Sequence, residues 1–82
     1  MSKLTQKFFR KLHNALMANE EYKSGYDYAK NHKLWDSMSV DELLVAVRVY
    51  YKMGFDGNRN AAGIAFALRE VIWQRLSREQ VA

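Results

Sequence analysis

Hydrophobic side chains recur at helical spacing along most of the chain, beginning near its N-terminus. Between about residues 4 and 18, an apolar stripe and a polar stripe follow the period of an amphipathic helix. The apolar stripe consists of Leu4, Phe8, Leu12, Ala15 and Leu16. We expect these side chains to pack into the core.

A second helix is predicted from Asn19 to about Asn31. Asn19 is a favourable N-cap residue, and the two glutamates that follow it suit the first turn of a helix. Residues 32–38 lack a helical period and are expected to form a loop that holds Trp35.

The third helix has a clear start and a predicted stop. Ser39 and Glu42 have the spacing of a capping box, which marks a helix N-terminus. At the other end, Gly54 suits the left-handed residue that terminates many helices, and Phe55 is then expected to pack on Tyr50. This pattern predicts a helix from Val40 to about Met53.

The last helix is predicted from about Ala61 to Leu76, with Asn58 or Asn60 as its N-cap. It has two apolar faces. One consists of Ile64, Ala65, Leu68, Ile72 and Leu76, and the other of Ala62, Phe66, Arg69 and Trp73. We expect the first face to point into the core and Trp73 to lie outside it.

These segments predict an all-α protein, a small bundle of about four helices in a single domain spanning residues 1–82. Three alternating valines, at positions 45, 47 and 49, lie inside a longer helical pattern and do not indicate a strand. A chain of 82 residues buries roughly 60 % of its unfolded surface, which is enough for one core.

The net charge of +4 arises from the first 18 residues. Lys3, Lys7, Arg10 and Lys11 are the only charged side chains before Glu20. This cationic stripe has three interpretations: contact with nucleic-acid phosphates, attachment to an anionic membrane through Phe8 and Phe9, or a solvated face. Membrane binding is the least favoured of the three, because the core is expected to need Leu4, Phe8 and Leu12.

Several functional classes find no support in the composition. The chain has no cysteine, which excludes disulfides, cysteine-ligated zinc and cysteine nucleophiles. No apolar run approaches the length of a membrane span or a signal peptide, so we expect a soluble cytoplasmic protein. His13 and His32 stand apart from other catalytic residue types and are interpreted as solvated or structural. We therefore expect no enzymatic activity and no cofactor.

The segment 56–60 resembles the beginning of a calcium loop, but Ala61 and Ala67 occupy positions that need glycine and glutamate. We predict no metal site. The same segment precedes a helix, so Arg59 and nearby backbone N–H groups are a candidate phosphate contact. The alternative is an ordinary capped turn.

An internal similarity links two parts of the chain. Tyr22-x-x-Gly25-Tyr26 is followed 29 residues later by Tyr51-x-x-Gly54-Phe55. This similarity indicates either two related binding turns, from an old duplication, or the reuse of similar residues at helix ends. Gly25 lies in a predicted helix interior, where close approach of another helix or of a ligand would offset its cost of about 1 kcal/mol.

The two motifs, placed behind a basic helix, resemble those of ribosome modulation factors, a family of short basic helical proteins. The resemblance implies binding to the small ribosomal subunit and its RNA. The chain departs from the family pattern in having Tyr51 and Phe55 where tryptophan is usual. It also has a helix between the motifs, where the family has a proline-containing loop, and a further hydrophobic helix after them.

The leading hypothesis is a non-enzymatic basic protein that acts on RNA, the ribosome or another nucleic-acid machine. The predicted phosphate contacts are Lys3, Lys7, Arg10, Lys11 and Arg59, and the predicted stacking or partner surface is Tyr22, Tyr26, Phe66, Arg69 and Trp73. Arg69 can stack on either Phe66 or Trp73, three and four residues away. The alternatives are a phage- or plasmid-type inhibitor of a host protein complex, and a homodimer formed through the same stripe.

Overall fold

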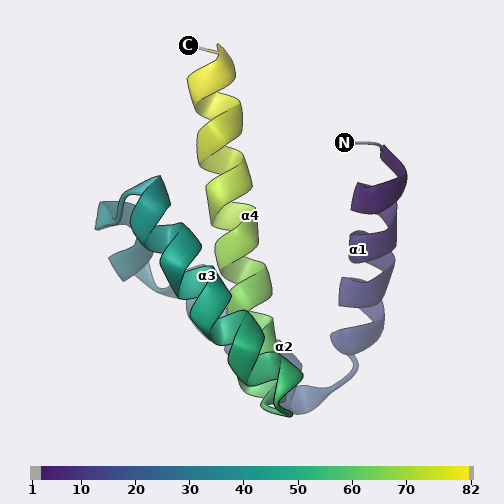
Figure 1. The fold of residues 1–82 in the computed structure, drawn as a ribbon. Helices are drawn as coiled ribbons and strands as arrows, with labels where there is room; N and C mark the ends of the chain where they lie inside the picture. Colours follow the sequence, from purple (N-terminus) through teal and green to yellow (C-terminus); the bar gives the residue numbers. More distant parts are fainter. Residues whose placement is uncertain (1–2, 82) are drawn as a thin grey trace.

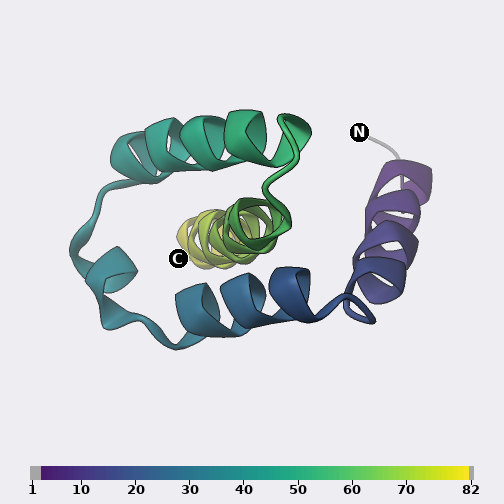
Figure 2. The ribbon, with the colours of Figure 1, turned by 90° about the horizontal axis from the view of Figure 1, so that it is seen from below.

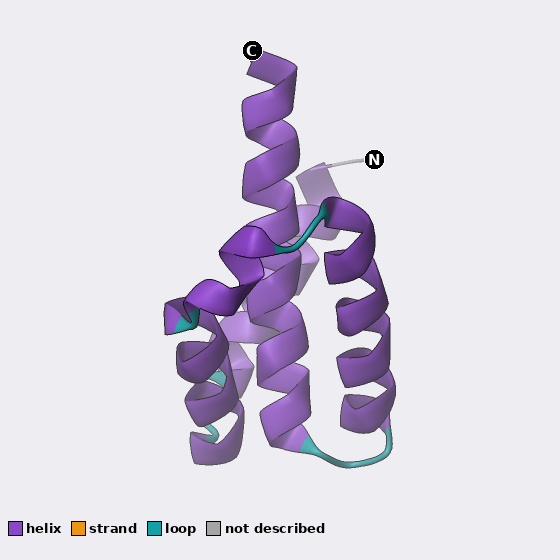
Figure 3. Ribbon diagram, turned by 90° about the vertical axis from the view of Figure 1, so that its left-hand side faces the viewer, coloured by secondary structure: helices purple, strands orange, loops and turns teal. Residues whose placement is uncertain are grey.

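A computed structural model describes the backbone of residues 3–81 and the side chains of residues 7–78. The elements, in chain order, are α1 (Lys3–Leu16), α2 (Glu20–Asn31), the 3₁₀ helix η1 (Lys33–Ser37), α3 (Val40–Phe55) and α4 (Arg59–Val81). Between residues 3 and 81 there is no strand (Figure 3). The prediction of a small all-α bundle is confirmed.

Helix α4 is the central element of the fold. It lies between α2 and α3, and Figure 2 shows it nearly end-on between them. The inward stripe predicted for α4 forms its contribution to the core, except for Leu76, which is partly exposed. The main core cluster consists of Ala29, Trp35, Leu43, Val47, Ile64, Ala67, Leu68 and Ile72. Over the residues described, no helix combines the length and the apolar character needed to cross a bilayer.

The predicted helix starts are confirmed by their hydrogen bonds. The side chain of Asn19 accepts a hydrogen bond from the backbone N–H of Tyr22, at 3.1 Å. Ser39 and Glu42 form the complete capping box. Asn58 caps α4, because its Oδ1 accepts from the backbone N–H of Ala61 at 3.0 Å. Segment 56–60 is thus a capped turn.

The predicted stop of α3 at Gly54 is wrong. The helix continues to Phe55, and the positive φ of 110° occurs at Gly57 instead. The missing side chain of Gly54 leaves room for α4. A Cβ built on it would lie 2.9 Å from the Cβ of Ala62. Phe55 is 89 % exposed, so the expected contact with Tyr50 does not anchor it in the core.

Two glycines allow the backbones of α2 and α4 to approach closely. A Cβ on Gly25 would lie 2.1 Å from the carbonyl oxygen of Asn60, and a Cβ on Gly63 would lie 2.1 Å from that of Tyr22. The helix-propensity cost of Gly25 is therefore offset by the close approach of a neighbouring helix, α4, and not by a ligand. Since Gly25 and Gly54 both pack against the first turns of α4, the two copies of the internal motif have a similar packing role.

The segment predicted as a loop after α2 is the short helix η1, and its position is determined by α4. Trp35 of η1 is buried, and its Nε1 donates a hydrogen bond to the carbonyl oxygen of Ala29 at 2.9 Å. Arg75 of α4 donates to the carbonyl oxygens of Trp35, at 2.6 Å, and Met38. These bonds tie the middle and the C-terminal end of η1 to α4.

Helix α1 stands apart from the other three, and its upper end diverges from α4 (Figure 1). The expectation that its apolar stripe packs into the core is wrong for Phe8 and Leu12, which are 61 % and 42 % exposed, and for Ala15, which is also exposed. The side chain of Leu4 lies outside those described. The physical reason is that α2 and α3 already enclose α4 on its core side, so α1 reaches only the remaining edge.

Candidate functional site

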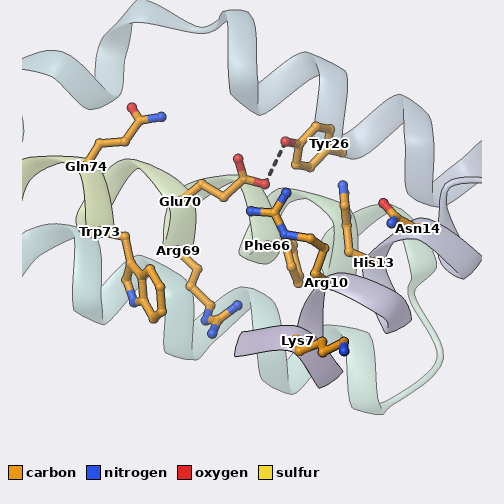
Figure 4. A pocket seen from close by; sticks show the side chains of 10 residues that line it. All are labelled: Lys7, Arg10, His13, Asn14, Tyr26, Phe66, Arg69, Glu70, Trp73 and Gln74. Atoms are coloured by element: carbon orange, nitrogen blue, oxygen red, sulfur yellow. Dashed lines mark hydrogen bonds between the residues drawn. The ribbon is translucent and has the colours of Figure 1, made fainter. Parts of the chain in front are cut away.

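The divergence of α1 from α4 leaves a groove of about 770 Å³ between them. Helix α1 forms one wall, α4 forms the other, and Tyr26 of α2 contributes to the floor (Figure 4). The lining residues are Lys7, Arg10, His13, Asn14, Tyr26, Phe66, Arg69, Glu70, Trp73 and Gln74. The groove therefore combines cationic side chains from one helix with aromatic side chains from another.

His13 holds α1 against the bundle. Its imidazole ring stacks on the ring of Phe66, with centroids 4.3 Å apart and planes inclined by 12°. The same imidazole contacts the ring of Tyr26, with the two ring centroids 4.5 Å apart. Its Nδ1 lies 2.9 Å from the hydroxyl oxygen of Tyr22. His13 is thus structural, which is one of the two roles expected from the sequence.

The protonation states at this contact follow from burial. Burial lowers the pKa of His13, an effect that nearby Glu70 opposes and that Arg10 reinforces. Burial also holds the pKa of Tyr22 well above its ordinary value. At neutral pH the His13 imidazole is therefore neutral and the Tyr22 hydroxyl is protonated, and the tautomer of the imidazole sets which of the two groups donates the hydrogen bond between them.

Arg69 lies among three aromatic rings. Its guanidinium carbon is 4.4 Å from the ring centroid of Phe9, 5.4 Å from that of Phe66 and 5.0 Å from that of Trp73. The predicted stacking on Phe66 and Trp73 is confirmed, and α1 adds Phe9. Such stacking orients the guanidinium plane. Trp73 remains 43 % exposed beside it, outside the core as expected.

Glu70 is the acidic residue of the groove, and it is engaged by α2. Tyr26 donates a hydrogen bond to one carboxylate oxygen at 2.7 Å, and Lys30 forms a salt bridge with the other at 2.8 Å. Burial alone would raise the pKa of Glu70, but these hydrogen bonds outweigh it and keep the pKa below its ordinary value. The hydrogen bond to Glu70 raises the pKa of Lys30. Burial, together with the hydrogen bond to Glu70, raises the pKa of Tyr26.

The charge balance of the groove is positive. Among the described side chains, Lys30 and Glu70 form the one salt bridge, so Lys30 offsets the acidic charge. Lys7, Arg10 and Arg69 also line the groove, and no carboxylate among side chains 7–78 forms a salt bridge with them. Their combined field favours an anionic ligand.

The other predicted site residues are dispersed. Lys11 is exposed on α1 but does not line the groove, and Arg59 is exposed at the first position of α4. Lys3 belongs to α1, but its side chain is outside those described. Tyr22 is buried against His13, so its assignment to a stacking surface is wrong. Its hydroxyl and ring belong to the attachment of α1.

Sequence reasoning missed Phe9, Asn14, Glu70 and Gln74 as neighbours of the candidate site. A signal for Phe9 was present, since it precedes His13 by one helical turn and the two share an edge of α1. Glu70 likewise follows Phe66 by four residues. Which edge of α1 faces α4 depends on how the helices pack, and the periodicity of α1 alone pointed to the wrong edge.

Comparisons of the chain with protein-family models, with curated proteins and with solved structures find no match. The resemblance to ribosome modulation factors therefore remains a prediction from two short motifs. In the structure, the glycines of both motifs serve helix packing. A functional assignment has to come from the groove.

Proposed function

We propose that this protein is a non-enzymatic nucleic-acid-binding protein that holds a single-stranded segment, with RNA as the preferred target, in the groove between α1 and α4. The observation that carries the proposal is the convergence of two predicted residue classes in one groove. Lys7 and Arg10 come from α1, whereas Arg69 and Trp73 come from α4. Phosphate neutralisation by cations and base stacking on aromatic rings are the two means of single-strand recognition.

A binding role suits the groove better than a catalytic one. Its titratable groups already have structural partners, since His13 bonds with Tyr22 and Glu70 with Tyr26 and Lys30. A general acid or base has to reach a substrate proton, and these groups are occupied in holding helices together. The exposed ring of Trp73 instead offers a face for one base.

The proposal predicts that removing the two groove cations weakens binding and its salt dependence. We expect Lys7→Gln/Arg10→Gln to reduce affinity for a labelled single-stranded RNA, measured by fluorescence anisotropy across a salt titration. Loss of two phosphate contacts lowers the slope of log K against log salt by about 1.4. The matched control is Lys23→Gln/Lys52→Gln, which removes the same charge from exposed positions on α2 and α3. An equal change of slope in both variants would contradict a groove site.

A second prediction concerns Trp73. Because its side chain is partly exposed, Trp73→Ala should lower the free energy of unfolding by about 1 kcal/mol or less. Loss of one stacked base should cost about 1–3 kcal/mol of binding. Chemical denaturation and RNA titration of the same variant measure the two effects. A loss of stability of about 3 kcal/mol or more, as for a core tryptophan, would show that Trp73 is structural.

The alternative, a regulator that binds a protein complex through the stripe of Phe66, Arg69 and Trp73, has less support. Helix α1 covers part of this stripe, through His13 on Phe66 and Phe9 on Arg69. A pull-down from lysate with and without nuclease separates the two functions. A stoichiometric protein partner that survives nuclease would favour the regulator.

A further inference from the structure

Among the side chains that the structure describes, none covers the apolar face of α1 fully at Phe8 and Leu12. The helix attaches to the bundle through Phe9 and His13, which lie on one edge of it. Phe8 and Leu12, one helical turn apart, lie on a different face, where Phe8 is largely exposed and Leu12 is partly exposed. Neither residue lines the groove. Exposed phenylalanine and leucine side chains on one helix face indicate an interaction surface.

The charge around this face is entirely positive. No acidic residue occurs before Glu20. At about 100° per residue, Lys11 lies on the helix about 60° from Phe8, and Lys7 precedes Lys11 by one turn. Both lysines are exposed. Helix α3 also exposes apolar side chains, Val45 and Val49, but its two acidic and two basic residues cancel. On α1, by contrast, every charged side chain beside the apolar face is cationic.

We propose that α1 binds an anionic lipid surface, with Phe8 and Leu12 inserted at the boundary between headgroups and acyl chains. Helices that lie in this boundary have a strongly cationic polar face opposite phenylalanine and leucine, and a low overall hydrophobicity. Lys7 and Lys11 then reach lipid phosphates while their aliphatic stems lie along the apolar face. The original argument against a membrane, that the core needs Phe8 and Leu12, is removed by their exposure.

Charge favours lipid over the other occupants of this face. A second copy of the chain would place two cationic helices side by side, where like charges repel. A nucleic acid would meet the lysines but would leave Leu12 without an apolar partner. An anionic bilayer surface satisfies both the lysines and the apolar side chains. Lys7 belongs to both the groove and the cationic border, whereas Phe8 and Leu12 do not line the groove, so the two apolar side chains distinguish this surface from the groove.

The test is sedimentation of the full chain with phosphatidylglycerol vesicles and, separately, with phosphatidylcholine vesicles. We expect binding to the anionic vesicles and much weaker binding to the neutral ones. Phe8→Ala/Leu12→Ala should reduce partition into phosphatidylglycerol by at least about tenfold, because two inserted side chains are truncated. The matched control, Val45→Ala/Val49→Ala, truncates two exposed apolar residues of α3 and should change partition by less than about twofold.

Three outcomes would overturn the inference: no binding to phosphatidylglycerol vesicles, equal binding to both vesicle types, or an equal loss in the control variant. Circular dichroism verifies that both variants keep their helical content. RNA affinity of the same variants separates this inference from the groove. If Phe8→Ala/Leu12→Ala abolishes RNA binding and leaves vesicle binding intact, the face belongs to the nucleic-acid site instead.

Discussion

At the scale of single residues, His13 carries the attachment of α1 to the bundle. It supplies a stacked ring for Phe66 and a hydrogen-bond partner for the hydroxyl of Tyr22. Burial favours the neutral imidazole, because the charged ring loses hydration in this partly buried position. The docking of α1 is therefore sensitive to the protonation of one side chain.

This contact predicts a pH-dependent stability. The folded-state pKa of His13 lies below its unfolded value of 6.5. In the window between these two pKa values the unfolded chain binds more protons, so stability rises with pH. The contribution of His13 is complete above pH 6.5 and is lost as the pH falls below it. Thermal unfolding measured at intervals below and above this pH should show the loss.

The variant His13→Phe is the control for this prediction. Phenylalanine retains a ring against Phe66 but has no proton to bind, so the pH dependence should disappear in this window. Glu70 does not interfere, since its pKa is below 4.5 and its stabilisation is lost at more acidic pH. A pH dependence that persists in His13→Phe would assign the titration to another group.

At the scale of elements, the crossing of α2 over α4 depends on two glycines. Gly25 faces the backbone of Asn60, and Gly63 faces that of Tyr22. With no Cβ at either position, the two helices approach backbone to backbone. Gly54 likewise lets α3 approach α4, where its neighbour is the side chain of Ala62. Helices α2 and α3 therefore both pack closely against the first turns of α4.

This geometry predicts that Gly25→Ala is destabilising although alanine favours helices by about 1 kcal/mol. The added Cβ would meet a backbone oxygen at 2.1 Å, so the helices have to separate. We expect the free energy of unfolding to fall by about 2 kcal/mol or more. Chemical denaturation measures it, with Ser24→Ala on the exposed side of the same helix as control. Stabilisation by Gly25→Ala would contradict the close crossing.

At the scale of the whole molecule, the protein consists of a three-helix core and an attached helix. The residues of the main core cluster lie in α2, η1, α3 and α4. Helix α1 adds contacts through Phe9 and His13 and presents its other faces to the groove and to solvent. In this arrangement α1 contributes more to the candidate binding surfaces than to the core.

Deletion of residues 1–18 tests this division. Asn19 is retained, so the N-cap of α2 remains. We expect the shortened chain to keep a helical circular-dichroism spectrum and a cooperative thermal transition, at a lower temperature because Tyr22 and Phe66 lose the cover of His13. Loss of cooperative unfolding would show that α1 is part of the core.

The sequence was informative where a local interaction decides the structure. The N-cap at Asn19 and the capping box at Ser39 depend on residues within one helical turn, and both are confirmed. The inward stripe of α4 is confirmed from Ile64 to Ile72, but Leu76 is exposed. The stacking of Arg69 on Phe66 and Trp73 is local in the same sense. Local spacing determines these features before the helices pack.

The tertiary structure decided what depends on other helices. Gly54 has the residue type of a helix stop, yet α3 continues through it to Phe55, and Ala62 of α4 packs where its side chain would be. Phe8 and Leu12 have the pattern of core residues, yet α2 and α3 already occupy the core side of α4. Periodicity identifies an apolar face, but whether a neighbour covers it depends on the space that the other helices leave. In α1, only the edge that carries Phe9 and His13 packs against α4. The groove lies beside this edge, and the apolar face of Phe8 and Leu12 remains exposed.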